Sequence, residues 1–487
     1  MVKMSLDAFA AHMLPPGPPP SPTSSPPPPD WEEPVAEHNN GSDDASSSSE
    51  DDDDDVPPHV HRWHAHATLE KPHAPIRKVT VIGCGCIGGY IGGSIAALGG
   101  GSGDSTVPTP LVSFLLSSSA RSAALATAVR EQGGLILKAG RSRPLLVPHA
   151  SFHMDPKEAL ARTDLVVVAT KRGANEALRD TLAAHCPSDV PVLLCQNGLD
   201  AAADFAPRAR TSQVIVTMNV VSSTSSPATF TLTSPLPKLT IAAAAEEACL
   251  DRAVRRGAEL GLKNGFGDAS EASLVTWLDR AGFHVTVAPP DAVSRFQRGK
   301  VIINMFNAPN ALCGRPTLST LVSRAACRLV AASMAEALAC FEAEARHSPR
   351  SSSSPSSSVV EPRWAVLAAS LVFRLLSFWA VNRLLLHLLS VAALLLCRWG
   401  LLWEGRPDKL LPLQAAHSSM WEDFHGGAAV RSTEVGLLNG AIVDMGLKYG
   451  VATPANAALL AAVRSVESGA VPRTHFSKEE RLWELLR

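Results

Sequence analysis

The sequence predicts an α/β protein in which an N-terminal, doubly wound domain of the Rossmann type is followed by an all-helical C-terminal domain. A disordered N-terminal tail precedes both. An apolar run at residues 78–82 leads into a glycine-rich turn, and strand and helix signals then alternate up to about residue 240. Strand signals are absent after residue 295. The chain has 487 residues, 46% of them hydrophobic, which is enough for a large core and excludes a wholly disordered protein.

The first 75 residues differ in composition from the rest. They carry 3 basic and 14 acidic side chains, whereas the remainder carries 41 basic and 32 acidic ones. Residues 15–29 contain ten prolines, and serines and aspartates dominate residues 42–55. Such segments have little to bury, so we expect residues 1–75 to be disordered. The start lacks a signal-peptide core and the tail is too acidic for a transit peptide, which makes cytoplasm the default location.

The residue pattern predicts neither a metal site nor a nucleic-acid-binding site. The nine cysteines form no CxxC pair, and the histidines of residues 59–66 lack carboxylate or cysteine neighbours at ligand spacing, so no metal site is predicted. No basic, aromatic-interleaved patch or recognition motif appears, so nucleic-acid binding is not expected. The excess of basic over acidic side chains after residue 75 instead favours the binding of small anionic ligands.

The most informative local pattern begins at residue 78. Lys78–Ile82 has the composition of a buried strand, and the next six residues form a GxGxxG motif that opens a helix. These six are Gly83, Cys84, Gly85, Cys86, Ile87 and Gly88. The three glycines permit a tight turn, close approach of a pyrophosphate and close helix packing, in that order. The motif predicts a dinucleotide site, and a glycine-rich turn without a ligand is the alternative.

The end of the second predicted strand, Leu111–Leu116, bears on the choice of cofactor. An NAD site usually has an acidic residue there for the ribose hydroxyls, but this chain has Ser117–Ser119 followed by Arg121. Serine hydroxyls and a guanidinium suit a 2′-phosphate, which favours NADP. An ordinary arginine on a helix surface is the alternative.

Further polar residues follow or lie within later apolar runs. Lys171 and Asn197 each end a predicted strand, where ligands of open α/β sheets bind. Residues 214–221 are expected to form one more strand. In the helical region, the pattern of residues 295–314 places Lys300, Asn304 and Asn307 on one helix face. A lysine and two amides on a largely apolar helix suggest a ligand site, and an amphipathic surface is the alternative.

Taken together, these motifs resemble the ketopantoate reductase (2-dehydropantoate 2-reductase) family. The matching segments, in the order of the family, are GCGCIGGYIGG, VVVATK, CQNGL, VTMNVV, GKVIINMFNAPNALCG, HSSMWEDF and STEVGLLNGAIVDMGLKYGVATPANAALL. The resemblance implies NADPH-dependent reduction of 2-dehydropantoate to (R)-pantoate, a step toward pantothenate and coenzyme A. Hydride transfer leaves charge on the ketone oxygen, which a nearby ammonium can stabilise and protonate.

The resemblance also assigns roles by position. It implies that Lys300 is the proton donor and that Glu434 is a second catalytic residue. Cofactor contacts fall to the GxGxxG residues, Lys171 and Asn197. It places substrate contacts at four positions, namely Asn197, Asn304, Asn307 and Ser419.

These patterns predict the domain limits. Residues 76–290 would form the NADP-binding domain, and residues 291–487 the helical substrate and catalytic domain, with a linker and an apolar segment inserted at 347–414. Residues 364–403 within the insert are long and apolar but contain arginines. For these residues the sequence leaves three alternatives, namely a membrane span, an interfacial helix or a buried helix.

Other functions stay open from the sequence alone. A reductase of another 2-keto acid is one alternative, because pockets vary within one fold. A non-catalytic, membrane-associated nucleotide-binding protein is another, since the insert and the stretched spacing between the SSM and TE motifs depart from the family pattern. A homodimer is also left open.

Overall fold

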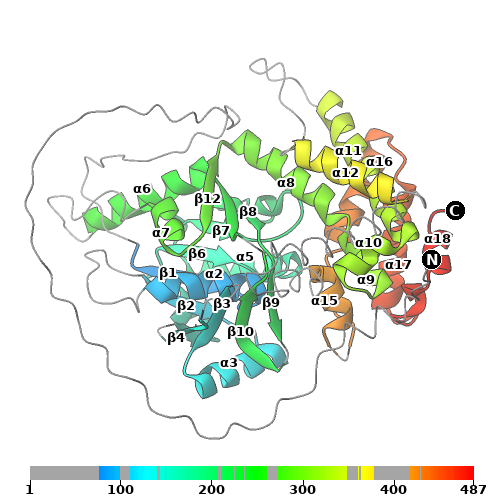
Figure 1. Cartoon of the computed structure of the whole chain (residues 1–487). Coiled ribbons are helices and arrows are strands. Elements are labelled where there is room, and N and C mark those ends of the chain that lie inside the picture. Colours follow the sequence, from blue (N-terminus) through cyan, green and yellow to red (C-terminus); the bar gives the residue numbers. More distant parts are fainter. Residues whose placement is uncertain are drawn as a thin grey trace, which may run out of the picture. The chain divides into compact units, whose positions relative to one another are not determined.

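An α/β region followed by a helical region makes up the described part of the computed structural model, which confirms the predicted fold class (Figure 1). The described residues are 76–98, 110–139, 143–148, 150–206, 208, 210–223, 225–234, 236–259, 273–347, 360, 363–377, 417–427 and 429–487. They all belong to one unit, Pro57–Arg487. The predicted tail, residues 1–75, lies outside them, and the domain limits near residue 290 stay predictions.

The main sheet of the α/β region has eight strands in the order β12-β11-β8-β7-β6-β1-β2-β5. Its strands are β1 (Lys78–Ile82), β2 (Leu111–Leu115), β5 (Ser151–His153), β6 (Leu165–Val168), β7 (Val192–Leu194), β8 (Thr211–Thr217), β11 (Lys238–Ala242) and β12 (His284–Ala288). All neighbours pair in parallel except β8 and β11. The central strands are buried on both faces, which is why they appear in the sequence as continuous apolar runs.

A smaller sheet has the order β4-β3-β10-β9. Its strands are β3 (Leu135–Ala139), β4 (Leu145–Val147), β9 (Val220–Ser223) and β10 (Ser226–Leu232). The prediction of one strand over residues 214–221 is therefore wrong. The chain leaves the main sheet after Thr217, and β9 pairs with β10 instead. An apolar run gives no signal for this change of sheet, because both strands bury apolar side chains.

Helices cover the two sheets. They are α2 (Cys86–Ala97), α3 (Ala120–Gln132), α4 (Pro156–Leu160), α5 (Asn175–His185), α6 (Ala243–Glu259) and α7 (Leu274–Arg280), with short 3₁₀ turns η2 (Arg172–Ala174) and η3 (Ala201–Phe205). The glycine-rich helix α2 contacts β2 of the main sheet and also β3 and β10 of the small sheet. It thereby joins both sheets into one apolar core.

The helical region packs around the long helix α11 (Arg324–His347). Its other elements are α8 (Pro290–Asn304), α9 (Asn307–Cys313), α10 (Thr317–Val322), α12 (Arg363–Ser377), α15 (Ser419–His425), the π-helical turn η6 (Gly436–Gly440), α16 (Ala441–Tyr449), α17 (Pro454–Glu467), η7 (His475–Ser477) and α18 (Glu479–Glu484). Within the described residues, no helix has the length and apolar character to cross a membrane. The predicted membrane contact through residues 364–403 is thus not supported, and residues 378–403 lie outside the described part.

The prediction that Lys300, Asn304 and Asn307 share one helix face is wrong. Helix α8 ends at Asn304, and α9 begins at Asn307. Pro309 explains the break, because a proline lacks the N–H that would bond to Met305 and its ring collides with that carbonyl. Asn307 therefore starts a new helix.

Candidate active site

The GxGxxG turn lies between β1 and α2, as predicted. Gly83 has φ +94°, a left-handed conformation that favours glycine, and a Cβ on Gly88 would collide with the Gly83 carbonyl oxygen. A Cβ on Gly85 would meet no atom within 4 Å, so the turn is open at that position. The first turn of α2 carries no acidic residue. The turn therefore presents free space and a helix N-terminus to an anionic group.

Hydroxyl groups and a guanidinium gather after β2. The Oγ atoms of Ser117, Ser119 and Ser122 lie 3.0 Å from one another. Arg121 is exposed, and its Nη2 donates to the Ser222 Oγ of β9 at 3.2 Å. These donors lie at the carboxyl end of a parallel strand, where the predicted 2′-phosphate would bind.

Lys171 connects the α/β region to the helical region. It follows β6, and its Nζ donates to the Asp423 carboxylate of α15 at 2.7 Å and to the Ser432 carbonyl at 2.6 Å. Burial raises the pKa of Asp423, and the hydrogen bond from Lys171 opposes that rise. In this structure the Lys171 amine is thus paired with Asp423.

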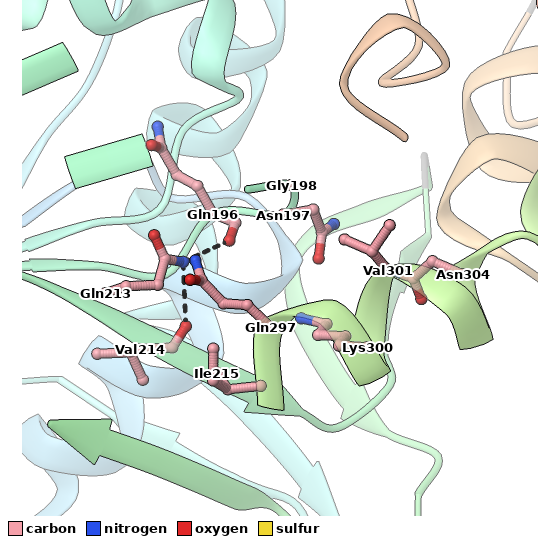
Figure 2. A pocket seen from close by; sticks show the side chains of 10 residues that line it. All are labelled: Gln196, Asn197, Gly198, Gln213, Val214, Ile215, Gln297, Lys300, Val301 and Asn304. Carbon is pink, nitrogen blue, oxygen red and sulfur yellow. Dashed lines mark hydrogen bonds between the residues drawn. The ribbon is translucent and has the colours of Figure 1, made fainter. Parts of the chain in front are cut away.

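A small cavity brings together three of the predicted site residues, Asn197, Lys300 and Asn304 (Figure 2). The lining residues come from the loop after β7, from β8 and from α8. They are Gln196, Asn197, Gly198, Gln213, Val214, Ile215, Gln297, Lys300, Val301 and Asn304. The parallel pairing of β7 and β8 places Gln213 opposite Leu194, at the end of β7, so the loop residues and β8 meet there.

The electrostatics of the cavity centre on Lys300. Burial lowers the pKa of Lys300 to about 8, and the nearby Glu434 carboxylate and Cys195 thiol are the two groups that can oppose the shift. Burial also raises the pKa of the Cys195 thiol to about 12. That thiol is neutral where Lys300 titrates, so we attribute the opposing effect to Glu434. The Asn197 Nδ2 donates to the Glu434 Oε2 at 2.9 Å, which links this carboxylate to the cavity.

Two predicted substrate residues do not line the cavity. Ser419 is exposed at the start of α15. Its neighbour Ser418 caps that helix by accepting from the Trp421 N–H, and its Oγ also donates to the Asn307 carbonyl. Asn307 lies at the start of α9 and is absent from the lining.

Sequence reasoning missed a hydrogen-bonded cluster under the loop that carries Asn197. Arg172 Nε and Nη2 donate to the Asp204 carboxylate at 2.6 and 2.8 Å. Asn175 Nδ2 donates to the same carboxylate at 2.8 Å, and Gln196 Nε2 donates to Asn175 Oδ1 at 2.7 Å. No motif signalled this cluster. Gln297 also lines the cavity and was not predicted from the sequence. Its position three residues before Lys300 indicates that the two side chains are neighbours on one helix.

Metal chemistry has no candidate in the part of the chain that the structure describes. There, no group of three or more His, Cys, Asp or Glu side chains is arranged to hold an ion.

Comparison with known proteins adds sequence relatives and shared folds. A 2-dehydropantoate 2-reductase from Aquifex aeolicus is 46% identical over 61 residues, which span 12% of this chain and 18% of that protein. A PanE/ApbA family ketopantoate reductase from Ralstonia eutropha JMP134 has a TM-score of 0.53 at 20% identity, over 82% of this chain and 100% of that one. D-mandelate dehydrogenase with NADH and anilino(oxo)acetate has a TM-score of 0.52 at 16% identity, over 80% of this chain and 99% of that one. At these identities the two structures show a shared fold.

Two family models match most of the described chain. Residues 79–245 match the model of ketopantoate reductase PanE/ApbA, and residues 293–467 match the model of its C-terminal part. The first match covers the glycine-rich turn and the main sheet as far as β11, and the second covers α8 with Lys300 and the helices after it. The chain belongs to the ketopantoate reductase PanE/ApbA family, whose members are NAD(P)-dependent oxidoreductases.

Proposed function

We propose that this protein reduces 2-dehydropantoate to (R)-pantoate with NADPH, a step of pantothenate and coenzyme A biosynthesis. The observation that carries the proposal is the position of Lys300. Its ammonium belongs to a cavity that also contains Asn197 and Asn304, and its pKa of about 8 leaves it charged at neutral pH yet able to give up a proton.

Each part of the site has a role in this proposal. The glycine-rich turn and Arg121 hold the pyrophosphate and the 2′-phosphate of NADPH, which supplies the hydride when bound. Lys171 contacts the cofactor once its amine leaves Asp423. Lys300 stabilises the charge that develops on the ketone oxygen and donates the proton to it. Asn197 binds both cofactor and substrate.

The remaining residues hold Lys300 and the substrate. Glu434 accepts from Asn197 and favours the charged form of Lys300. Asn304 binds the substrate from α8, one turn after Lys300. Asn307 and Ser419, which lie outside the cavity, contact the substrate only if α9 and α15 move toward it. A homodimer and a cytoplasmic location stay predictions.

The fold it shares with D-mandelate dehydrogenase makes reduction of an aryl 2-keto acid the second candidate. The test is oxidation of NADPH by the purified full chain with 2-dehydropantoate, phenylglyoxylate or pyruvate, repeated with NADH. We expect the highest kcat/KM for 2-dehydropantoate with NADPH. A higher kcat/KM for phenylglyoxylate would favour the second candidate. Absence of turnover with every 2-keto acid would support a non-catalytic nucleotide-binding protein.

A further inference from the structure

Two carboxamide side chains in the cavity have no part in the chemistry proposed above. Gln297 lies one helical turn before Lys300 on α8, and Gln213 lies on β8 (Figure 2). Both residues are buried, with 8% and 7% of their surface exposed. The Nε2 of Gln297 and the Oε1 of Gln213 have no hydrogen-bond partner among the described residues. The residues that line the cavity therefore include one donor and one acceptor without a partner among the described residues.

The orientation of the Gln213 amide is fixed by its own hydrogen bonds. Its Nε2 donates to the Gln196 carbonyl at 2.8 Å and to the Val214 carbonyl at 3.3 Å. Turning the amide over would aim Oε1 at two carbonyl oxygens, which cannot donate. The free end of Gln213 is therefore an acceptor. Leaving such a group buried and unpaired costs free energy, and a ligand that pairs with it recovers that cost.

A hydroxyl group satisfies both amides at once. It accepts from the Gln297 Nε2 and donates to the Gln213 Oε1, whereas a carboxylate only accepts and a methyl or phenyl group does neither. Gln297 precedes Lys300 by one turn of α8. With the substrate ketone at Lys300, we therefore place the hydroxyl toward Gln297, on the second carbon beyond the ketone carbon.

We infer that Gln297 and Gln213 recognise a substrate hydroxyl and so determine specificity. They select 2-keto acids that carry a hydroxyl two carbons beyond the ketone over keto acids of the same shape without it. The inference rests on the proposed function and extends it to two residues that the family resemblance did not assign.

The test compares two substrates that differ only in this hydroxyl. They are 2-dehydropantoate, which is 4-hydroxy-3,3-dimethyl-2-oxobutanoate, and 3,3-dimethyl-2-oxobutanoate. With the full chain and NADPH, we expect a kcat/KM ratio on the order of 10² or more in favour of the hydroxylated acid, because the analogue leaves both amides unpaired. Both values come from one preparation, so the ratio does not depend on the folded fraction.

Gln297→Met keeps the length of the side chain and removes the donor. We expect it to reduce the ratio by about 10-fold or more, mainly through a loss with 2-dehydropantoate. The matched control is Gln132→Met at the end of α3, which lies outside the cavity lining and should leave the ratio unchanged.

The outcomes separate the inference from the proposed function. A wild-type ratio near one, with both acids reduced, would overturn the inference and leave the reductase intact. A large wild-type ratio that Gln297→Met does not change would also overturn the inference and leave the reductase intact, because the hydroxyl is then recognised elsewhere. If neither acid is reduced, the proposed function fails and the inference fails with it.

Discussion

The charge of Lys300 decides whether the cavity can deliver a proton. Its pKa of about 8 results from burial, with Glu434 acting in the opposite direction. In the proposed mechanism Lys300 must be protonated to act as the acid, so kcat/KM for reduction should be constant below pH 8 and fall about tenfold per pH unit above it. Glu434→Gln removes the charge that raises this pKa, so the fall should begin at a lower pH. A pH profile that stays in place in this variant would remove Glu434 from the role.

Arg121 is the residue on which the proposed preference for NADPH depends. Arg121→Ala should weaken NADPH binding by about 10-fold or more, since a charged hydrogen bond contributes about 1.5–3 kcal/mol, and should affect NADH much less. Fluorescence titration of both cofactors measures the difference. Arg130→Ala, in the last turn of the same helix, is the control. Equal losses for NADPH and NADH would place Arg121 outside the cofactor site.

Individual site residues differ in how well the sequence predicts their position. Lys300 and Asn304 are one turn apart on one helix, so their proximity follows from helical spacing. Asn197 could be placed because it follows a buried strand. Gln213 could not, because its position depends on the register between β7 and β8. The position of Asn307 does not follow from helical spacing, because Pro309 interrupts the helix between Asn304 and Asn307.

Residues of η2, α5 and η3 form a hydrogen-bonded cluster that supports the loop after β7. Asp204 of η3 accepts from both Arg172 and Asn175, and Asn175 in turn bonds to Gln196. Asp204→Ala should lower the free energy of unfolding by about 1–3 kcal/mol, because it removes the carboxylate that accepts from the half-buried Arg172 guanidinium and the buried Asn175 amide.

The same variant should lower kcat/KM by about 10-fold, because the loop no longer holds Asn197 in place. Thermal unfolding and steady-state kinetics test the two effects. Asp180→Ala, which removes an exposed ion pair with Arg179 on α5, should change neither. Wild-type stability and kinetics in Asp204→Ala would mean that the cluster does not support the site.

Strands and helices with strong local signals were predicted, and pairings between distant segments were not. The first strands of the main sheet appear as apolar runs that end in turns, and the structure confirms them. The small sheet joins segments about 90 residues apart in sequence, such as β3 and β10, which no local pattern indicates. The TPAN segment at residues 453–456 has a packing role, since Asn456 is buried and donates to the Glu336 carboxylate.

The cavity requires both regions of the chain. Asn197 and Gln213 belong to the α/β region, whereas Lys300 lies on α8, and Glu434, which accepts from Asn197, precedes η6. Lys171 and Asp423 add an ion pair between the same two regions. The motifs of both regions could be identified from the sequence, but the pairing between them appears only in the structure.

Residues 1–75 contribute no predicted site residue, and their composition leaves them little to bury. A chain that starts at residue 76 should therefore keep kcat/KM and thermal stability within about twofold and about 1 kcal/mol of the full chain. Enzyme kinetics and thermal unfolding of both chains measure this. A large loss of either would assign the tail a role in the fold or in catalysis.

The most direct test of the reductase mechanism is the turnover of 2-dehydropantoate with NADPH by Lys300→Ala. We expect kcat to fall by about 10²-fold or more, the usual loss when a general acid is removed, while NADPH binding stays close to wild type. Lys300→Arg should not restore the rate, because a guanidinium does not give up its proton near neutral pH. Turnover by Lys300→Ala at a rate near that of the wild type would contradict the role of Lys300 and the mechanism built on it.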